Sequence, residues 1–437
     1  MAFRFSFGKP PPETAPAVRF RAAGEDDRTR NINLLKARRS STFDVNAALI
    51  HQAVALDSTS MQIDRAPSGS SVTLEVDGVL HPLPPVDIAT ATELVNAYKQ
   101  LAGLSAKEAR WRQSGQFTAT VDHKSWECTV ISSGVSSGER TQVLFDSGDP
   151  EFPNLAAGSL REPVLRKMRT ALASRTGLVL FSAPPDSGMV EILEAAVRDS
   201  DRFQRSYFLL ESSRRPRAGI ENVTTRKFDG SSTTIESLLQ TISKEHPDVL
   251  ILPELTDGTA VDAMTAQPAQ SRLALTGISA NDAPEALLRA LSLRCNASRF
   301  AGEITAVANG RLVRKLCVTC RQSYLPPPQV LVKLDLPIAE TQALFRSSGR
   351  IVGERDEPIP CPACFGLGYR GRAMAIEWLE INDAMRATML GNSEDHLSQL
   401  RQQARQAGMT PLRKEAVALI AQGLTSVQEI SRVLKGE

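Results

Sequence analysis

Residues 178–195 read LVLFSAPPDSGMVEILEA, an apolar run followed by a turn and then a segment with helical periodicity. Nucleotide-binding proteins place a phosphate loop, G-x-x-x-x-G-K-[ST], in such a turn, where backbone N–H groups cradle the phosphates and the Lys and hydroxyl complete the site. Here Ala183 and Gly188 stand at the two glycine positions, and Met189 and Val190 replace the lysine and the hydroxyl residue. Taken alone, the stretch fits a strand-to-helix turn without a ligand better than a nucleotide site.

Strand-like and helical segments alternate on both sides of this turn. Strand-like runs occur at 177–182, 206–211, 248–254 and 272–279, and helical runs at 162–173, 189–198 and 233–244. This alternation predicts a doubly wound, mostly parallel α/β sheet. Ligands bind such sheets at the carboxyl ends of the strands, and both Ser182 and Glu254 lie at such ends, which favours a site of nucleotide-binding ancestry.

The first third of the chain has a different pattern. Helical runs at 45–56 and 90–104 are interspersed with alternating strand-like runs at 71–83, 115–122, 127–133 and 138–146, which predicts an α+β domain. Asp77-Gly78 is a strong hairpin-turn signal within it. The Gly-, Asp- and Pro-rich stretch 146–154 predicts a linker, and residues 1–30, rich in Pro and charge, predict a disordered arm.

Composition limits the classes of partner. The 437 residues include 51 basic and 49 acidic side chains, a formal charge of +2, so net charge gives no reason to expect binding to nucleic acid or to an anionic membrane surface. The length suggests about two to four domains. No stretch of about 18 apolar residues and no export signal is found, which predicts a cytoplasmic location.

Four of the six cysteines form two C-x-x-C pairs, Cys317 with Cys320 and Cys361 with Cys364. In a reducing compartment such pairs indicate a metal site before disulfides, and four thiolates provide the closed tetrahedral shell of structural zinc. The alternative is four buried or free cysteines. The glycines that follow the second pair would permit a tight turn; they are Gly366, Gly368 and Gly371.

From about residue 45 onward the chain resembles the hexameric ATPases of type II secretion and type IV pilus assembly, the secretion E-protein family of traffic motors. The most specific segments are CPACFGLGYRGRAMAIEWLEIND at 361–383 and GMTPLRKEAVALIAQGLTSVQEISRVL at 408–434. VDGVL, QSGQF and GERTQVLFD resemble the domain that precedes the family's motor core. The resemblance implies a RecA-like P-loop core, which in the family binds ATP and Mg²⁺.

The phosphate loop departs from the family pattern. The family's G-P-T-G-S-G-K-[ST] aligns with residues 183–190, which keeps Ser187 and Gly188 and loses the lysine and the Mg²⁺ ligand at Met189 and Val190. Asp186 adds a carboxylate that would repel phosphate. Because phosphoryl transfer depends on positioning and charge neutralisation, losing the lysine, the Mg²⁺ ligand and the arginines of the preceding domain together should abolish turnover.

The segment that carries the family's catalytic glutamate is half preserved. In HPDVLILPELTD, Glu254 occupies the glutamate position and Asp257 is kept, whereas Pro253 and Thr256 replace the family's Gly and Arg. Glu254 cannot activate water usefully without a positioned γ-phosphate. The alternative interpretation of Glu254 is a solvated carboxylate at a strand end.

Three further motifs also depart from the family. The acidic segment T-V-E-D-P resembles residues 209–213, where Glu211 is kept and Ser212 replaces the Asp. The histidine box resembles residues 276–283, with Ser279 at the histidine position. In the preceding domain, Thr73 and Glu75 occupy the strand on which the family carries arginines.

The resemblance therefore implies a degenerate, non-enzymatic scaffold or regulator of a secretion or pilus apparatus. One alternative is an active ATPase that takes a cation from elsewhere, such as Lys167 or Arg198; another is a nucleotide sensor without hydrolysis, binding an anion at the helix N-terminus. The resemblance implies that the partners are the inner-membrane platform and cytoplasmic adaptor proteins of the apparatus. It also implies a homo- or hetero-hexamer that contacts the membrane only through these partners, with the inner face of the cytoplasmic membrane as one possible location.

Pattern and resemblance together predict five segments. They are a disordered arm (1–30), an N-terminal α+β domain (31–150), a RecA-like core (151–310), a tetracysteine zinc element (311–375) and a C-terminal helical region (376–437).

Overall fold

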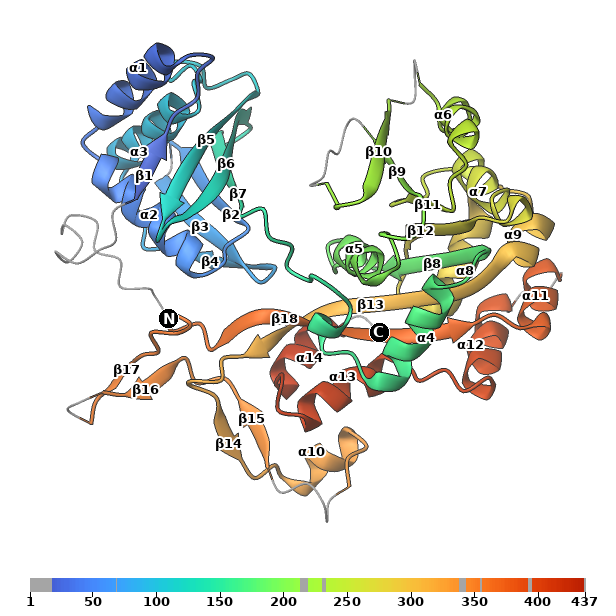
Figure 1. Cartoon of the computed structure of the whole chain (residues 1–437). Helices are drawn as coiled ribbons and strands as arrows, with labels where there is room; N and C mark the ends of the chain where they lie inside the picture. Colours follow the sequence, from blue (N-terminus) through green and yellow to red (C-terminus); the bar gives the residue numbers. More distant parts are fainter. Residues whose placement is uncertain are drawn as a thin grey trace. The chain divides into compact units, whose positions relative to one another are not determined.

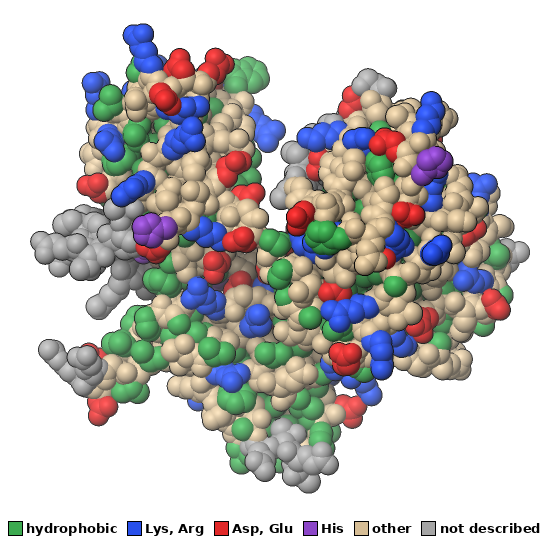
Figure 2. Space-filling model, viewed as in Figure 1, with side chains coloured by type: hydrophobic (Ala, Val, Ile, Leu, Met, Phe, Trp, Pro, Cys, Tyr) green, Lys and Arg blue, Asp and Glu red, His purple; other side chains and the backbone are tan. Residues whose placement is uncertain are grey.

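A computed structural model describes residues 18–67, 69–212, 219–229, 233–337, 343–353, 356–391 and 395–435. The chain folds into two compact units. Unit 1 comprises Met1–Pro150 and Gly349–Gly371, and unit 2 comprises Glu151–Ser348 and Arg372–Glu437. Figure 2 shows Lys, Arg, Asp and Glu side chains interspersed over the visible face of each unit, as the near-zero net charge leads one to expect.

Unit 1 is an α+β domain built on a seven-stranded sheet in the order β1-β5-β6-β7-β2-β3-β4. Helices α1, α2 and α3 lie on one side of this sheet (Figure 1), and their apolar faces pack against its inward-facing residues. The elements of unit 1 are β1 (Arg19–Arg21), α1 (Asp27–Arg38), α2 (Phe43–Ala55), β2 (Ser60–Ala66), β3 (Gly69–Val76), β4 (Val79–Pro82), α3 (Ile88–Leu101), β5 (Gln113–Val121), β6 (Lys124–Val135), β7 (Gly138–Asp146), β16 (Arg350–Val352) and β17 (Pro358–Pro360).

The hairpin between β3 and β4 turns at Asp77-Gly78, as the sequence predicts. Asp77 has φ +51° and Gly78 has φ +72°. Two successive residues with positive φ give a turn whose twist matches that of the flanking antiparallel strands, and this is why Asp-Gly is favoured there.

The predicted disordered arm is wrong for residues 18–30. Strand β1 pairs with β5, and α1 begins at Asp27. The Phe20 ring lies 5.5 Å from the ring of Phe43 and 5.9 Å from that of Phe117, and Asp26 caps α1 by accepting a hydrogen bond from Thr29 N. These contacts order a polar stretch whose composition alone predicts disorder. Residues 1–17 of the predicted arm lie outside the described residues.

Unit 2 is the α/β core with its appended elements. They are η1 (Ala156–Gly158), α4 (Glu162–Leu172), β8 (Gly177–Ala183), α5 (Met189–Asp199), β9 (Tyr207–Ser212), β10 (Val223–Phe228), α6 (Ile235–Ile242), η2 (Ser243–Glu245), β11 (Val249–Leu252), α7 (Gly258–Thr265), η3 (Pro268–Gln270), β12 (Leu273–Ser279), α8 (Ala283–Ser292), α9 (Ala297–Glu303), β13 (Ile304–Leu316), β14 (Gln322–Tyr324), α10 (Pro328–Lys333), β15 (Leu344–Arg346), β18 (Tyr369–Glu380), α11 (Asp383–Leu390), α12 (His396–Gln406), α13 (Leu412–Ala421) and α14 (Val427–Val433).

The main sheet of unit 2 has the order β10-β9-β11-β12-β8-β13-β18, and its neighbours from β10 to β13 all pair in parallel. Its central strands are buried on both faces. Val179 and Phe181 belong to the core on the α4 and α5 side, whereas Leu178 and Leu180 belong to the core on the α6, α7 and α8 side. This confirms the predicted mostly parallel α/β fold, with helices on both faces (Figure 1).

The sequence patterns do not predict every strand of unit 2; the missed strands are β10, β13, β14, β15 and β18. The edge strand β10 is rich in charged and polar residues and half exposed, so it lacks an apolar strand pattern. Helices α11 to α14 follow β18, in agreement with the predicted helical C-terminal region. Among the described residues, no helix has the length and apolar composition needed to cross a bilayer.

Candidate nucleotide site and cysteine cluster

The turn after β8 has the backbone shape of a phosphate loop. Strand β8 ends at the buried Ala183, and α5 begins after Gly188, whose φ of +98° lies in the left-handed region. Asp186 is exposed and also has a positive φ, +57°. Ser187 N donates to Pro184 O at 3.2 Å, and Ser187 O accepts from Leu312 N at 3.1 Å. The loop is therefore held by hydrogen bonds to itself and to β13.

Met189 and Val190, at the positions of the family's lysine and hydroxyl residue, form the first turn of α5. The Met189 side chain turns toward the sheet, because a Cβ added to Gly277 of β12 would lie 2.9 Å from Met189 Sδ. Met189 also packs against the apolar core beneath α5. At the position that the sequence resemblance assigns to the lysine, an uncharged thioether is thus held by apolar contacts.

Glu211, the acidic residue near the end of β9, is buried and lies beside a lysine of the neighbouring strand. Glu211 is 3% exposed, and its Oε2 lies 3.8 Å from Nζ of Lys227, which faces it across the β9–β10 pairing. Ser212 ends β9, and Ser213 lies outside the described residues.

Glu254 and Asp257 follow β11 at the carboxyl edge of the sheet. Asp257 caps α7: its Oδ1 accepts from Ala260 N at 2.9 Å, and its Oδ2 accepts from Thr256 Oγ1 at 3.1 Å. Glu254 is half-buried in the connection between β11 and α7. One retained acid is therefore committed to helix capping, and Glu254 remains at the predicted strand end.

Two buried polar residues of β13 join the ends of β8 and β12. Asn309 Nδ2 donates to Ser182 Oγ at 2.6 Å and to Ala280 O at 3.2 Å. Arg311, only 2% exposed, donates to Asn309 Oδ1 at 3.0 Å and to Asn281 O at 2.7 Å. Neither residue was singled out from the sequence, although a polar pair inside the apolar strand TAVANGRLV could have drawn attention to them.

The cations considered as substitutes for the missing lysine are both engaged elsewhere. Lys167 Nζ lies 3.3 Å from Glu380 Oε2, and Arg198 Nη2 lies 2.9 Å from Glu194 Oε2. The sequence itself contains no basic residue from 178 to 196. In this structure both cations are therefore paired with glutamates.

The positions of the family's arginines in the preceding domain lie on β3 of unit 1. Glu75 Oε2 accepts from Ser60 Oγ at 2.8 Å, and Thr73 faces Gln62 in the β2–β3 pairing. Neither position carries a positive charge.

The four predicted metal ligands lie together. The sulfur atoms of Cys317, Cys320, Cys361 and Cys364 are all within 4.8 Å of one another, and all four residues are buried. The first pair follows β13 and the second follows β17. Four sulfurs so close, with no disulfide among them, are what a tetrahedral metal site requires, so the cluster can bind a metal ion.

Glycines shape the turn around the second pair, as the sequence predicts. Gly366, Gly368 and Gly371 all have positive φ, between +73° and +86°. Gly368 N points at Cys364 Sγ at 3.2 Å, and such N–H···S bonds orient a ligating thiolate.

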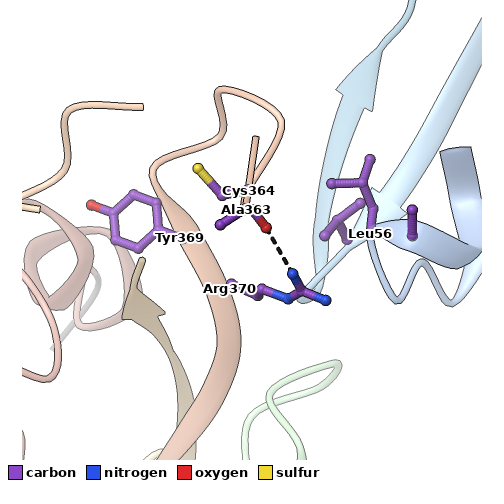
Figure 3. Close-up of a pocket in the computed structure, with 7 residues that line it drawn as sticks. Leu56, Ala363, Cys364, Tyr369 and Arg370 are labelled. Carbon is purple, nitrogen blue, oxygen red and sulfur yellow. Dashed lines mark hydrogen bonds between the residues drawn. The ribbon is translucent and has the colours of Figure 1, made fainter. Parts of the chain in front are cut away.

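A shallow apolar pocket of unit 1 adjoins this turn (Figure 3). Arg370 Nη1 donates to Ala363 O at 2.8 Å and closes the turn, while Leu56 lies on the opposite side. Arg370 also lies 3.4 Å from the carboxylate of Asp57. Cys364 also lines the pocket, and its sulfur points away from Leu56, so one member of the cysteine cluster borders this pocket.

Comparison with solved structures gives matches over most of the chain. The ATPase DotB of Legionella pneumophila matches with a TM-score of 0.60 and 13% identity over 90% of this chain and 95% of that one. The pilus retraction motor PilT with bound ADP matches with a TM-score of 0.51 and 14% identity over 88% and 95%. At these identities the likeness shows the fold: unit 2 is a RecA-like P-loop core.

Sequence comparison is more specific. The family model of type II/IV secretion system proteins matches residues 38–432. The chain therefore belongs to this family.

Characterised relatives are distant in sequence but similar over long stretches. The protein transport protein HofB homolog of Escherichia coli is 25% identical over 88% of this chain and 80% of its own length. The type II secretion system protein E of Klebsiella pneumoniae is 25% identical over 88% and 74%. The type IV pilus assembly ATPase PilB of Thermus thermophilus is 22% identical over 87% of this chain, which spans only 42% of that relative.

Proposed function

We propose that this protein is a catalytically inactive member of the secretion ATPase family, which acts as a scaffold or regulator of a secretion or pilus apparatus. The observation that carries the proposal is the first turn of α5, where Met189 and Val190 replace the lysine and the Mg²⁺ ligand and Met189 packs toward Gly277.

The energetic consequence is large because both lost groups make charge-assisted contacts. Hydrogen bonds to charged groups contribute about 1.5 to 3 kcal/mol each. Losing a cation and a metal ligand together would weaken ATP binding by about 3 to 6 kcal/mol, and Asp186 adds repulsion. Nucleotide binding of that weakness leaves Glu254 without a γ-phosphate on which to direct water.

The contacts that hold the loop and the neighbouring strand ends are made within the protein. The loop bonds to Leu312 N, and Asn309 and Arg311 tie the ends of β8 and β12 together. We propose that this chain assembles into a homo-hexamer, or into a hetero-hexamer with an active paralogue. The assembly would bind the membrane platform and adaptor proteins of the apparatus at the inner face of the cytoplasmic membrane.

We also propose that the cysteine cluster holds one structural zinc ion. Four thiolates complete a tetrahedral shell and leave no position for a reactive water, so the ion would stabilise the segment 311–375 without taking part in chemistry.

A second candidate function, an active motor with an atypical site, is favoured only by the retention of Glu211, Glu254 and Asp257. Two of these carboxylates are already engaged, Glu211 beside Lys227 and Asp257 at the α7 cap. The inactive scaffold is therefore better supported.

The decisive experiment measures phosphate release from ATP and Mg²⁺ by the wild-type protein, alone and with a candidate platform protein. The matched control is Glu254→Gln, which removes the carboxylate at the catalytic position. We expect both proteins to stay at background. Turnover by the wild type that disappears in Glu254→Gln would overturn the proposal.

A further inference from the structure

The connection between α3 and β5 in unit 1 presents a highly exposed tryptophan. Trp111 is 76% exposed, whereas the other two tryptophans, Trp126 and Trp378, are 7% and 5% exposed. Arg110 and Arg112, on either side of it, are also exposed. A single exposed aromatic residue is ordinary by itself. What distinguishes Trp111 is that an amphipathic ring lies between two exposed cations on a loop of fixed shape.

The loop that carries Trp111 is built to hold its shape. Glu108 Oε1 accepts hydrogen bonds from Arg110 N at 2.6 Å and Trp111 N at 2.9 Å. Gln113 bonds to both N and O of Ser105, and Gly134 N donates to Arg110 O at 3.1 Å. The tip is therefore fixed at its base by both β5 and β6.

A buried lysine supports the same loop from beneath. Lys99 is fully buried, and its Nζ donates to Glu108 O at 2.5 Å and forms an ion pair with Glu139. Burying an ammonium group is expensive unless it is fully bonded. The chain thus uses one of its most costly core residues to fix the loop, and a fixed loop loses little conformational entropy when it binds.

The charge of the tip is positive even though that of the whole chain is near zero. Residues 105–112, SAKEARWR, contain Lys107, Arg110 and Arg112 against a single acid, Glu108, whose carboxylate is occupied by backbone N–H groups. Within the part of the chain that the structure describes, none of these three cations forms an ion pair. A cationic tip around an amphipathic ring matches the chemistry of an anionic membrane surface, where Trp settles at headgroup depth and each Lys or Arg adds electrostatic attraction.

We propose that the loop 105–112 of unit 1 is a direct contact site for an anionic lipid bilayer, with Trp111 entering the headgroup region and Arg110, Arg112 and Lys107 facing the lipid phosphates. A bilayer is favoured over an acidic protein because the rest of the tip, Ser105, Ala106 and Ala109, offers little apolar area for a protein interface core. The sequence predicts membrane contact only through partners; this site adds direct contact and is independent of nucleotide.

The test uses the full-length protein and vesicles of phosphatidylcholine with or without phosphatidylglycerol. Binding to phosphatidylglycerol vesicles should shift Trp111 emission to shorter wavelength and shield it from iodide, while Trp126 and Trp378 report unchanged folding. Phosphatidylcholine vesicles should do neither. The double change Arg110→Gln and Arg112→Gln should lower the partition coefficient of the protein onto phosphatidylglycerol vesicles about thirtyfold. Trp111→Ser should lower the same coefficient about tenfold, as measured by vesicle sedimentation.

Phe203 provides the matched control. It is 64% exposed, and the Arg202 guanidinium lies 4.6 Å from its ring centroid, so Phe203→Ser removes an exposed aromatic beside an arginine in unit 2. We expect this variant to bind vesicles like the wild type. Absence of binding to phosphatidylglycerol vesicles, binding that leaves Trp111 open to iodide, or equal losses in Trp111→Ser and Phe203→Ser would each overturn the proposal.

Discussion

Leu312, on β13, packs directly on Gly188 at the start of α5: a Cβ placed on Gly188 would overlap Leu312 Cγ. The same strand donates from Leu312 N to Ser187 O at 3.1 Å. The glycine of the phosphate loop is therefore required by packing within the protein as well as by any ligand.

Gly188→Ala should destabilise the protein by about 2 to 4 kcal/mol, because the added methyl group both meets Leu312 and forces a non-glycine residue into the left-handed region. Urea unfolding followed by circular dichroism measures the effect. The matched control is Gly302→Ala in α9, where no atom lies within 4 Å of the added Cβ, and where stability should be unchanged or rise by up to about 1 kcal/mol. Equal stabilities of the two variants would contradict the role assigned to Leu312.

Met189→Lys alone should not create an ATPase. The added ammonium group would supply one contact to phosphate, but Ser212, Thr256 and Ser279 still lack the acid, the arginine and the histidine of the family. We expect phosphate release by this variant to equal that of the wild type. A rate clearly above the wild type would show that the rest of the site is competent.

The cysteine cluster should contain about one zinc per chain, measured by elemental analysis of reduced, freshly purified protein. Removing the metal with a chelator should raise amide hydrogen exchange in residues 311–375 and leave exchange in β8 and β12 unchanged. Cys361→Ser should reproduce the effect, whereas Cys128→Ser, at a buried cysteine outside the cluster, should retain the metal. Metal-free protein with unchanged exchange would refute the zinc assignment.

Glu429 should make stability depend on pH in the acid range. Burial alone would raise the pKa of its carboxyl, but hydrogen bonds from Arg432 and Arg314 outweigh burial and lower the pKa to about 2. A carboxyl whose pKa falls on folding contributes stability above its unfolded pKa and loses it as the pH falls toward the folded value. We therefore expect a contribution of about 2 to 3 kcal/mol at neutral pH that declines between about pH 4.5 and 2.

Glu429→Gln should remove that contribution and flatten the acid limb of the stability profile. The control is Glu380→Gln, which breaks only the exposed pair with Lys167 and should change stability by less than about 1 kcal/mol at any pH. An acid limb of wild-type steepness in Glu429→Gln would disprove the assignment.

The sequence by itself determined the α/β core, the parallel sheet and the cysteine cluster. Alternating apolar strands and amphipathic helices admit few packings, and Gly188, the Asp77-Gly78 turn and the two C-x-x-C pairs have local chemistry that any fold must satisfy. The absence of the lysine and hydroxyl at Met189 and Val190 was also visible there, since a missing charge needs no coordinates.

Only the tertiary structure showed which partners the buried polar side chains bind. Asn309 and Arg311 act through Ser182 and Asn281, residues 127 and 30 positions away, respectively, and no local pattern encodes such contacts. The order of β1 likewise depends on Phe43 and Phe117, which composition cannot reveal. Burial and partner choice are set by the summed packing of distant segments, so the role of Lys99, which is buried and paired with Glu139 forty positions away, became apparent only in three dimensions.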